Sequence, residues 1–191
     1  QADLAVGGSV LGNGSAVADT LIVKSATIDL TNTTLTGVEI LKAGLSAATN
    51  FTVDSLDLAA GGSVIGSSGS DTLTTNDTAL DLTSTTLTSI EKLAAGTGSD
   101  TTFTVNQADL AAGGSVTGGA GTADTLVITG TSFDISSTSV TSVEKLQAGS
   151  NAATTFTVNQ ADLASGGTII GGAGSDTLTT KEAALNLTST T

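Results

Sequence analysis

The sequence predicts an all-β protein: a right-handed parallel β-helix (β-solenoid) of about seven coils. Three observations lead to this fold class. An aspartate flanked by aliphatic residues returns at sequence spacings of about 24 to 28. Short segments that alternate apolar residues with Thr run in phase with it. Proline, which would remove a backbone donor from a central strand, is absent. A right-handed crossover is the rule for parallel strands.

The aspartate step marks eight units, and alternate units resemble each other most. Phe51, Phe103 and Phe156 are separated in the sequence by 52 and 53. We therefore expect coils of about 24–28 residues, with pairs of coils repeating about every 52–53 residues. The central residues of the eight steps are Asp3, Asp29, Asp57, Asp81, Asp109, Asp134, Asp162 and Asn186.

Alternation along the strand-like segments predicts which side chains form the core. In Thr102-Phe103-Thr104-Val105, Phe103 and Val105 share one face and the two Thr share the other. The segments at Glu91-Lys92 and Glu144-Lys145 break the alternation, so we expect bends there. We expect two sets of inward side chains, the first stacked in a single column: Phe51, Phe103, Phe156, Leu21, Leu73, Leu126 and Leu178, followed by Val23, Val53, Val105, Ile128 and Val158.

Composition restricts the partners. The formal net charge is −13, from 18 acidic residues and five lysines. This charge opposes nucleic acid binding and favours divalent cations as partners. No apolar run approaches the ~18 residues of a membrane span, so membrane insertion is not expected. There is no cysteine, which is compatible with an extracellular location but does not by itself indicate one.

Both ends of the sequence fall inside a unit, because Gln1 matches Gln107 and Thr191 matches Thr86. We therefore expect residues 1–191 to form a single β-solenoid repeat domain, a segment of a longer repeat array. Self-association end to end, or stacking on neighbouring repeats, follows from the open strand edges of such a segment.

Glycine-rich turns carry a family resemblance. Residues 171–179, Gly-Gly-Ala-Gly-Ser-Asp-Thr-Leu-Thr, resemble the nonapeptide of RTX-type calcium-binding repeats, and residues 66–73, 96–100 and 118–126 are partial copies. The whole chain resembles the Thr-, Ser-, Gly- and Asp-rich repeats of large secreted bacterial surface proteins of the S-layer and adhesin type. This resemblance implies secretion, a cell-surface location and calcium binding. An RTX-like calcium-binding secretion or folding module is the alternative within the same resemblance.

Four aspartates in these turns are the candidate calcium ligands: Asp71, Asp100, Asp124 and Asp176. Three of them fall in successive units, so Asp71, Asp100 and Asp124 are expected to form a three-layer acidic edge. Backbone carbonyls of the glycine turns would supply further oxygens. The competing interpretation is an ordinary Asx turn. Asp57, Asp81 and Asp109, about 4.8 Å apart if the coils stack in register, are expected to cap turns, with calcium as the other hypothesis.

Two other functions have partial support in the sequence. Outward Thr pairs such as Thr72/Thr74 and Thr102/Thr104 resemble ice-binding ladders on solenoids, although high β-propensity explains Thr there equally well. A polysaccharide-active β-helix enzyme needs a cleft with an acid or base and a cationic group, whereas His, Cys, Arg and Tyr are absent and no insertion interrupts the period. We expect no enzyme, but a structural repeat segment of an extracellular bacterial filament, surface layer or adhesin, stabilised by calcium.

Overall fold

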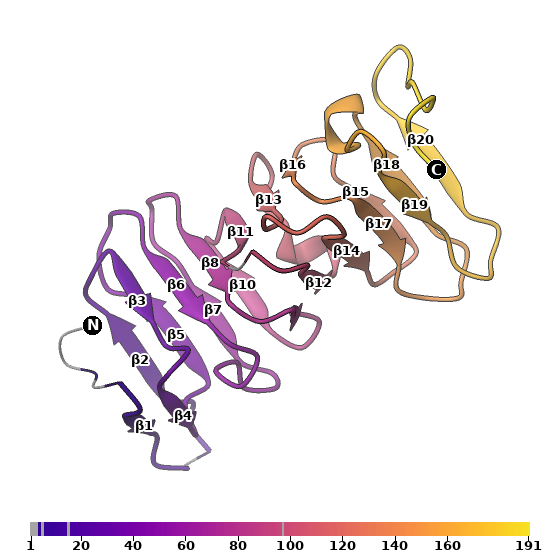
Figure 1. The fold of residues 1–191 in the computed structure, drawn as a ribbon. Helices are drawn as coiled ribbons and strands as arrows, with labels where there is room; N and C mark the ends of the chain where they lie inside the picture. The colour runs from indigo at the N-terminus through magenta and orange to yellow at the C-terminus, as the bar shows by residue number, and fades with distance from the viewer. Residues whose placement is uncertain (1–3, 5, 15, 97) are drawn as a thin grey trace.

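The chain folds into an elongated β-solenoid of about seven turns, as the sequence predicts. The computed structural model describes residues 4, 6–14, 16–96 and 98–191; Gln1 and Asp3 of the first unit lie outside this part. Strands stack along one long axis, so the chain runs in order from one end of the molecule to the other (Figure 1). All strand pairs in the described residues are parallel.

Each turn has three faces. Strands β7 (Ser63–Ile65), β8 (Thr72–Thr75) and β9 (Ala79–Asp81) belong to three different sheets, and β10 (Thr86–Thr88) then pairs with β7 to start the next turn. Such short strands cannot bury their apolar faces alone, so the core forms only because the turns stack.

The strands of the described residues form five sheets along these faces (Figure 1). The two-stranded sheet pairs β1 (Ser9–Leu11) with β4 (Thr34–Thr36), and the four-stranded sheet runs from β2 (Thr20–Val23) through β5 (Ile40–Ala43) and β7 to β10. The six-stranded sheet contains β3 (Thr27–Asp29), β6 (Asn50–Val53), β8, β11 (Lys92–Ala95), β13 (Ser115–Thr117) and β16 (Ser139–Thr141). The five-stranded sheet contains β9, β12 (Thr102–Val105), β14 (Thr125–Ile128), β17 (Lys145–Ala148) and β19 (Thr168–Ile170). The three-stranded sheet contains β15 (Ser132–Asp134), β18 (Thr155–Val158) and β20 (Thr177–Thr180).

The turns are shorter than the sequence spacing suggested. Asn50 pairs with Thr72 and Thr72 with Lys92, which are sequence separations of 22 and 20. The largest separation between paired strands in the described chain is 25, from Ser9 to Thr34. The expected spacing of 24 to 28 per coil is therefore too long. That spacing is the sequence distance between two different kinds of aspartate turn, and not the number of residues in one turn of the solenoid.

The covalent repeat that separates Phe51, Phe103 and Phe156 spans two turns and one further face. Two turns above β6 lies β11, and β12, which carries the same motif as β6, follows on the next face. Accordingly the equivalent strands β6, β12 and β18 lie in three different sheets. Successive copies of the motif thus lie on each of the three faces in turn.

The predicted inward side chains are confirmed, but they do not form one column. Phe51, Phe103 and Phe156 are buried, whereas Thr104 is half-buried, so the strand register is as expected. Phe51 lies beside Leu73 in the six-stranded sheet, and Phe103 lies beside Leu126 in the five-stranded one. The core is therefore a continuous apolar interior lined from three sides. Leu21 and Leu178, near the two ends, are only partly buried.

The predicted bends are present. Ser89 and Ser142, both with φ of 51°, precede β11 and β17, and Gly37 has the equivalent position before β5 with φ of 63°. A left-handed backbone reverses the chain direction sharply enough to turn the corner between two faces. Glu91 and Glu144 follow two residues after these serines and take part in the contacts described next.

Candidate functional site

The four predicted calcium ligands lie at corners that precede strands of three different sheets. Asp71 precedes β8, Asp100 and Asp124 precede β12 and β14 on adjacent turns of one sheet, and Asp176 precedes β20. The expected three-layer edge of Asp71, Asp100 and Asp124 is therefore wrong, because a motif moves by one face with each covalent repeat. The expected column of Asp57, Asp81 and Asp109 is also wrong, since Asp81 lies beside Thr104.

Asp71 and Asp124 hold the turns together. Both are completely buried, and Oδ1 of each accepts the backbone N–H of a threonine on the turn below: Thr49 to Asp71 and Thr101 to Asp124, both over 2.6 Å. Asp176 accepts the N–H of Thr154 in the same way, over 2.8 Å. Oδ1 of each carboxylate thus bonds to a neighbouring turn, and not to the backbone two residues later as in an ordinary Asx turn.

Glutamates complete the arrangement from the turn above. Glu91 accepts the N–H of Asp71 over 2.8 Å, and Glu144 accepts the N–H of Asp124 over 2.9 Å. Glu39 does the same for Asp19. We call this arrangement of a threonine N–H, an aspartate and a glutamate the corner clamp. Its bonds are charge-assisted, which makes them roughly twice as strong as neutral ones.

The clamps differ in one detail. Oδ2 of Asp71 accepts both the N–H and the hydroxyl of Ser67, at 2.6 and 2.9 Å. Oδ2 of Asp124 is buried and has no hydrogen-bond partner within the described chain. Gly119 stands where the first motif has Ser67, and one residue is inserted before Asp124. Glycine has no hydroxyl to donate, so one of the two Ser67 donors has no counterpart here.

Calcium binding stays a prediction. Among the described residues, no group of three or more acidic side chains is placed to hold one metal ion. Asp100 is exposed and accepts the N–H groups of Thr122 and Ala123, at 2.8 and 3.0 Å. The candidate ligands are thus occupied mainly with backbone donors.

A second kind of aspartate site lies where the sheets stop. We call residues 54–57, 106–109 and 159–162 the first, second and third sheet breaks. In the second, the 3₁₀ helix η1 (Gln107–Asp109) contacts β10, the last strand of one sheet, and β15, the first strand of another. In the third, η2 (Gln160–Asp162) contacts β16, the last strand of the six-stranded sheet. The first break lines a groove together with residues 31–35.

At the second break, a glutamine side chain makes the hydrogen bonds that a paired strand makes elsewhere in the sheets. Gln107 donates through Nε2 to the carbonyl of Asp134 over 3.0 Å and accepts the Asp134 N–H at Oε1 over 2.7 Å. The side-chain amide therefore takes the place of a backbone peptide group. Gln160 accepts the N–H of Asn186 over 2.7 Å in the third break. The first break has Ser55 at this position.

Each break buries one carboxyl group, from Asp57, Asp109 or Asp162, at 3 to 4% exposure. Each accepts an N–H three residues earlier in the chain, over 2.9, 2.7 and 2.7 Å. Burial raises the pKa of Asp57 to about 7 and that of Asp109 to about 6, against the lowering effect of the hydrogen bond. Burial likewise raises the pKa of Asp162. Neighbouring carboxylates contribute to the rise of all three pKa values.

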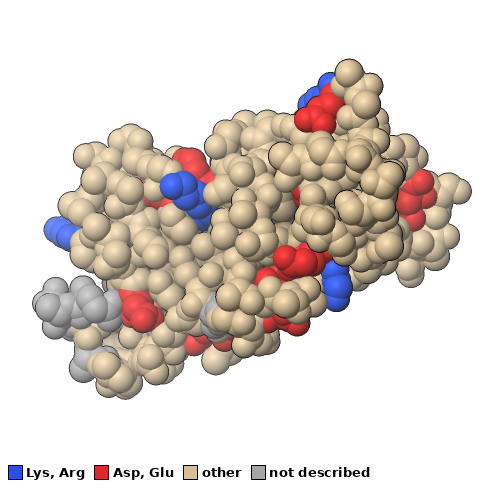
Figure 2. All heavy atoms as spheres, turned by 45° about the horizontal axis from the view of Figure 1, so that its top comes forward, with Lys and Arg blue, Asp and Glu red and all other residues tan. Residues whose placement is uncertain are grey.

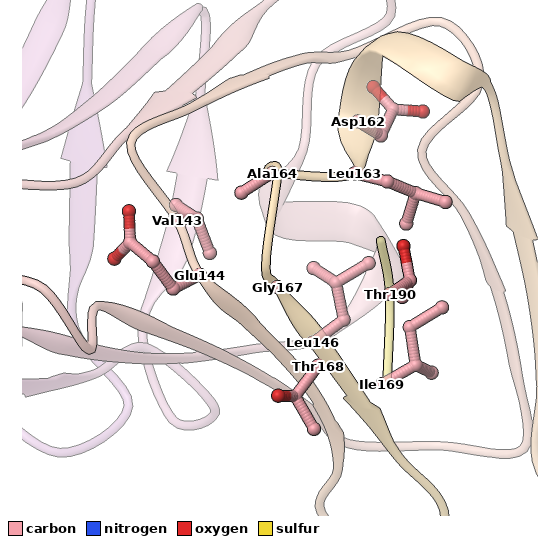
Figure 3. A pocket seen from close by; sticks show the side chains of 10 residues that line it. All are labelled: Val143, Glu144, Leu146, Asp162, Leu163, Ala164, Gly167, Thr168, Ile169 and Thr190. Atoms are coloured by element: carbon pink, nitrogen blue, oxygen red, sulfur yellow. The ribbon is translucent and has the colours of Figure 1, made fainter. Parts of the chain in front are cut away.

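Equivalent shallow grooves adjoin the first two breaks. Asp54, Leu56 and Asp57 line a space of about 280 Å³, and Asn106, Ala108 and Asp109 line one of about 200 Å³. A different, smaller cavity of about 10 Å³ reaches Asp162 from β17 and β19, and Figure 3 shows Asp162 and Leu163 on one side of it and Leu146 and Ile169 on the other. That space is at the lower limit for one water molecule.

The outer surface has no single dominant feature on the face seen in Figure 2, where acidic groups are scattered among uncharged residues. The outward Thr pairs are divided among the faces. Thr155/Thr157 and Thr177/Thr179 are adjacent, but Thr72/Thr74 lies between Asn50/Thr52 and Lys92/Ala94. The Thr array expected for ice binding is therefore interrupted.

The sequence contained signals for both kinds of site. Asp19, Asp71 and Asp124 are each followed by a glutamate twenty residues later, which is the length of the shortest turn. The buried break aspartates follow the pattern x-x-x-Asp-Leu after a Val, whereas the exposed Asp29 and Asp81 end a strand. Separating these two contexts would have distinguished the buried carboxyl groups from the turn caps.

No helix among the described residues has the length and apolar character needed to cross a membrane. Searches against protein-family models, curated proteins and solved structures found no match.

Proposed function

We propose that this chain is a structural repeat segment of an extracellular bacterial filament, surface layer or adhesin. The observation that supports the proposal most is how the polar side chains are used. Buried carboxylates such as Asp71 and Asp124 bind backbone N–H groups of adjacent turns. A solenoid whose few charged groups connect its own turns is suited to act as a stiff spacer.

The location can be tested on intact cells of the source. An antibody raised against the folded segment is applied before and after the cells are permeabilised. Labelling of intact cells is expected, together with release of the labelled material by surface extraction. Labelling that requires permeabilised cells contradicts the proposal. The proposal assigns the chain no enzymatic activity, and glycan cleavage by the purified segment would also contradict it.

Stacking on further turns, from neighbouring repeats or from another copy, is part of the proposal. Strand β2 is the edge of its sheet at one end of the solenoid, and β20 is the edge of its sheet at the other. Apolar side chains line open spaces beside these edges: Leu21, Val23 and Ile28 at one end, and Phe156 and Leu178 at the other. Free edges pair readily with further strands. Light scattering should therefore show a mass that grows with concentration, and a constant monomer mass would exclude association between copies.

Calcium remains a separate proposal that is based on the resemblance to RTX-type turns. If an ion binds the folded chain alone, its melting temperature rises with calcium concentration. Equal melting temperatures in chelator and in calcium would remove this proposal and leave the structural function untouched.

A further inference from the structure

We propose that the three sheet breaks are pH-responsive weak points of the solenoid, which are tight in acid and loosen as the pH rises through neutrality. This inference goes beyond the structural function proposed above, because it concerns how stability is distributed along the rod. It follows from three features that coincide at each break: a sheet that stops, a buried carboxyl group, and neighbouring carboxylates.

The breaks interrupt the backbone ladder that connects successive turns. Between β10 and β15, the cross-turn bonds at Asp134 come from the side chain of Gln107 and not from a strand. The six-stranded sheet, in contrast, pairs continuously from β3 to β16. Local opening is easiest where few cooperative backbone bonds must break. The breaks should therefore open before the sheets do.

Opening a break transfers its carboxyl group to water. Asp57 is 3% exposed and Asp109 4% exposed when the breaks are closed. A charge at these positions is poorly solvated, whereas the neutral acid is not. Ionisation thus favours the open state, and protonation favours the closed state.

The charged neighbours rank the three breaks. Asp57 faces Asp54 in its own turn, Asp77 after β8 and Asp29 at the end of β3. Asp109 faces Asp81 at the end of β9. Asp162 faces Glu182 and Asp134, but Lys181 pairs with Asp134 over 2.6 Å. The first break, which has the most carboxylates and no lysine among these neighbours, should respond most strongly.

The direction of the pH effect follows from linkage. The closed first break holds its proton up to a pKa of about 7, whereas the open form releases it near the ordinary value of 3.8. Between these values the closed state binds more protons, so opening becomes easier as the pH rises. For the second break the upper limit is about 6.

Amide hydrogen exchange on the full chain tests the proposal at pH 5 and pH 8, with rates corrected for the intrinsic pH dependence of exchange. Opening measured at the amides of Asp54 and Asp57 is expected to be at least about tenfold more frequent at pH 8, since each unit of pKa difference corresponds to about tenfold. Amides of β8 in the continuous sheet should change much less. An equal pH response at the breaks and in β8 would overturn the proposal on wild-type data alone.

The variant Asp57→Asn keeps an oxygen for the N–H of Asp54 but cannot ionise. It should abolish the pH response of the first break and leave those of the second and third unchanged. Asp100→Asn is the matched control, because it removes one exposed carboxylate that is not among the charged neighbours of Asp57, Asp109 or Asp162 and should leave all three responses intact. If Asp57→Asn retains the wild-type pH response, Asp57 is not the responsible group and the proposal is wrong.

Discussion

The backbone N–H of Asp71 donates to the carboxylate of Glu91 over 2.8 Å, and Glu91 stands twenty residues later on the next turn. Because Asp71 itself accepts the N–H of Thr49 from the turn below, one aspartate connects three consecutive turns. The same relay recurs from Thr101 through Asp124 to Glu144. These acidic residues thus connect consecutive turns of the solenoid.

Removing the glutamate from one clamp should lower stability. Glu91→Ala leaves the N–H of Asp71 without its charged acceptor, and we expect a loss of about 1–2 kcal/mol in the free energy of unfolding. Glu91→Gln retains a neutral acceptor and should lose clearly less. Urea denaturation followed by circular dichroism measures both. If the Ala variant is as stable as the wild type, the clamp does not stabilise the fold.

Close approach of two turns leaves no room for a side chain at Gly118 or at the equivalent Gly12 and Gly66. A Cβ at Gly118 would overlap the carbonyl oxygen of Ser142 on the next turn, and backbone cannot move aside without separating the turns. Gly118→Ala should therefore destabilise the chain by about 3 kcal/mol or more, as overpacked core substitutions do at their upper range. Gly98→Ala, where a Cβ would meet no atom within 4 Å, is the control and should unfold at nearly the wild-type urea concentration.

At a corner with a left-handed backbone, substitution by glycine should raise stability. Ser142 has a φ of 51°, while Gly37 occupies the equivalent corner of the first repeat. Ser142→Gly should relieve strain and raise stability by up to about 1 kcal/mol, since the strain of a non-glycine residue there exceeds the entropy that glycine loses. Gly37→Ala should lower it. Thermal unfolding of both variants checks the pair, and a destabilised Ser142→Gly would show that the serine is not strained.

Much of the fold could be predicted because strand alternation acts locally. The inward positions of Phe103 and Val105 follow from the pleat, and neither depends on how the turns stack. The number of residues per turn, in contrast, depends on how the turns stack. The recurrence of Asp57 and Asp81 shows sequence similarity, but it does not show which residues pair between turns. A repeat that covers two turns and one face moves equivalent residues to a new face. For this reason the sequence predicts an acidic edge of Asp71, Asp100 and Asp124 that the fold does not form.

The first break can be repaired by design. Ser55 stands where Gln107 bridges to Asp134 in the second break. Ser55→Gln should add the equivalent pair of bonds to Asp81, with a gain of about 0.5–1.5 kcal/mol. Gln107→Ala should cost a similar amount at the second break. Hydrogen exchange at Asp81 and Asp134 locates each effect, and a Ser55→Gln variant with unchanged exchange at Asp81 would show that the glutamine does not bridge there.

The third break permits a direct test of its carboxyl group. Burial is the main cause of the raised pKa of Asp162, and Glu182 is the largest charged contributor that raises it further. Glu182 also accepts the N–H of Gln160 over 2.8 Å, a bond that a glutamine side chain can keep. Glu182→Gln should therefore lower the pKa of Asp162 without moving the turn, because it removes a nearby negative charge and retains the acceptor. Carbon-13 NMR titration of the side-chain carboxyl groups measures this pKa, with Asp100→Asn as a charge-matched control that should leave it unchanged. An Asp162 pKa that is the same in Glu182→Gln and wild type would show that the charge of Glu182 does not contribute to it.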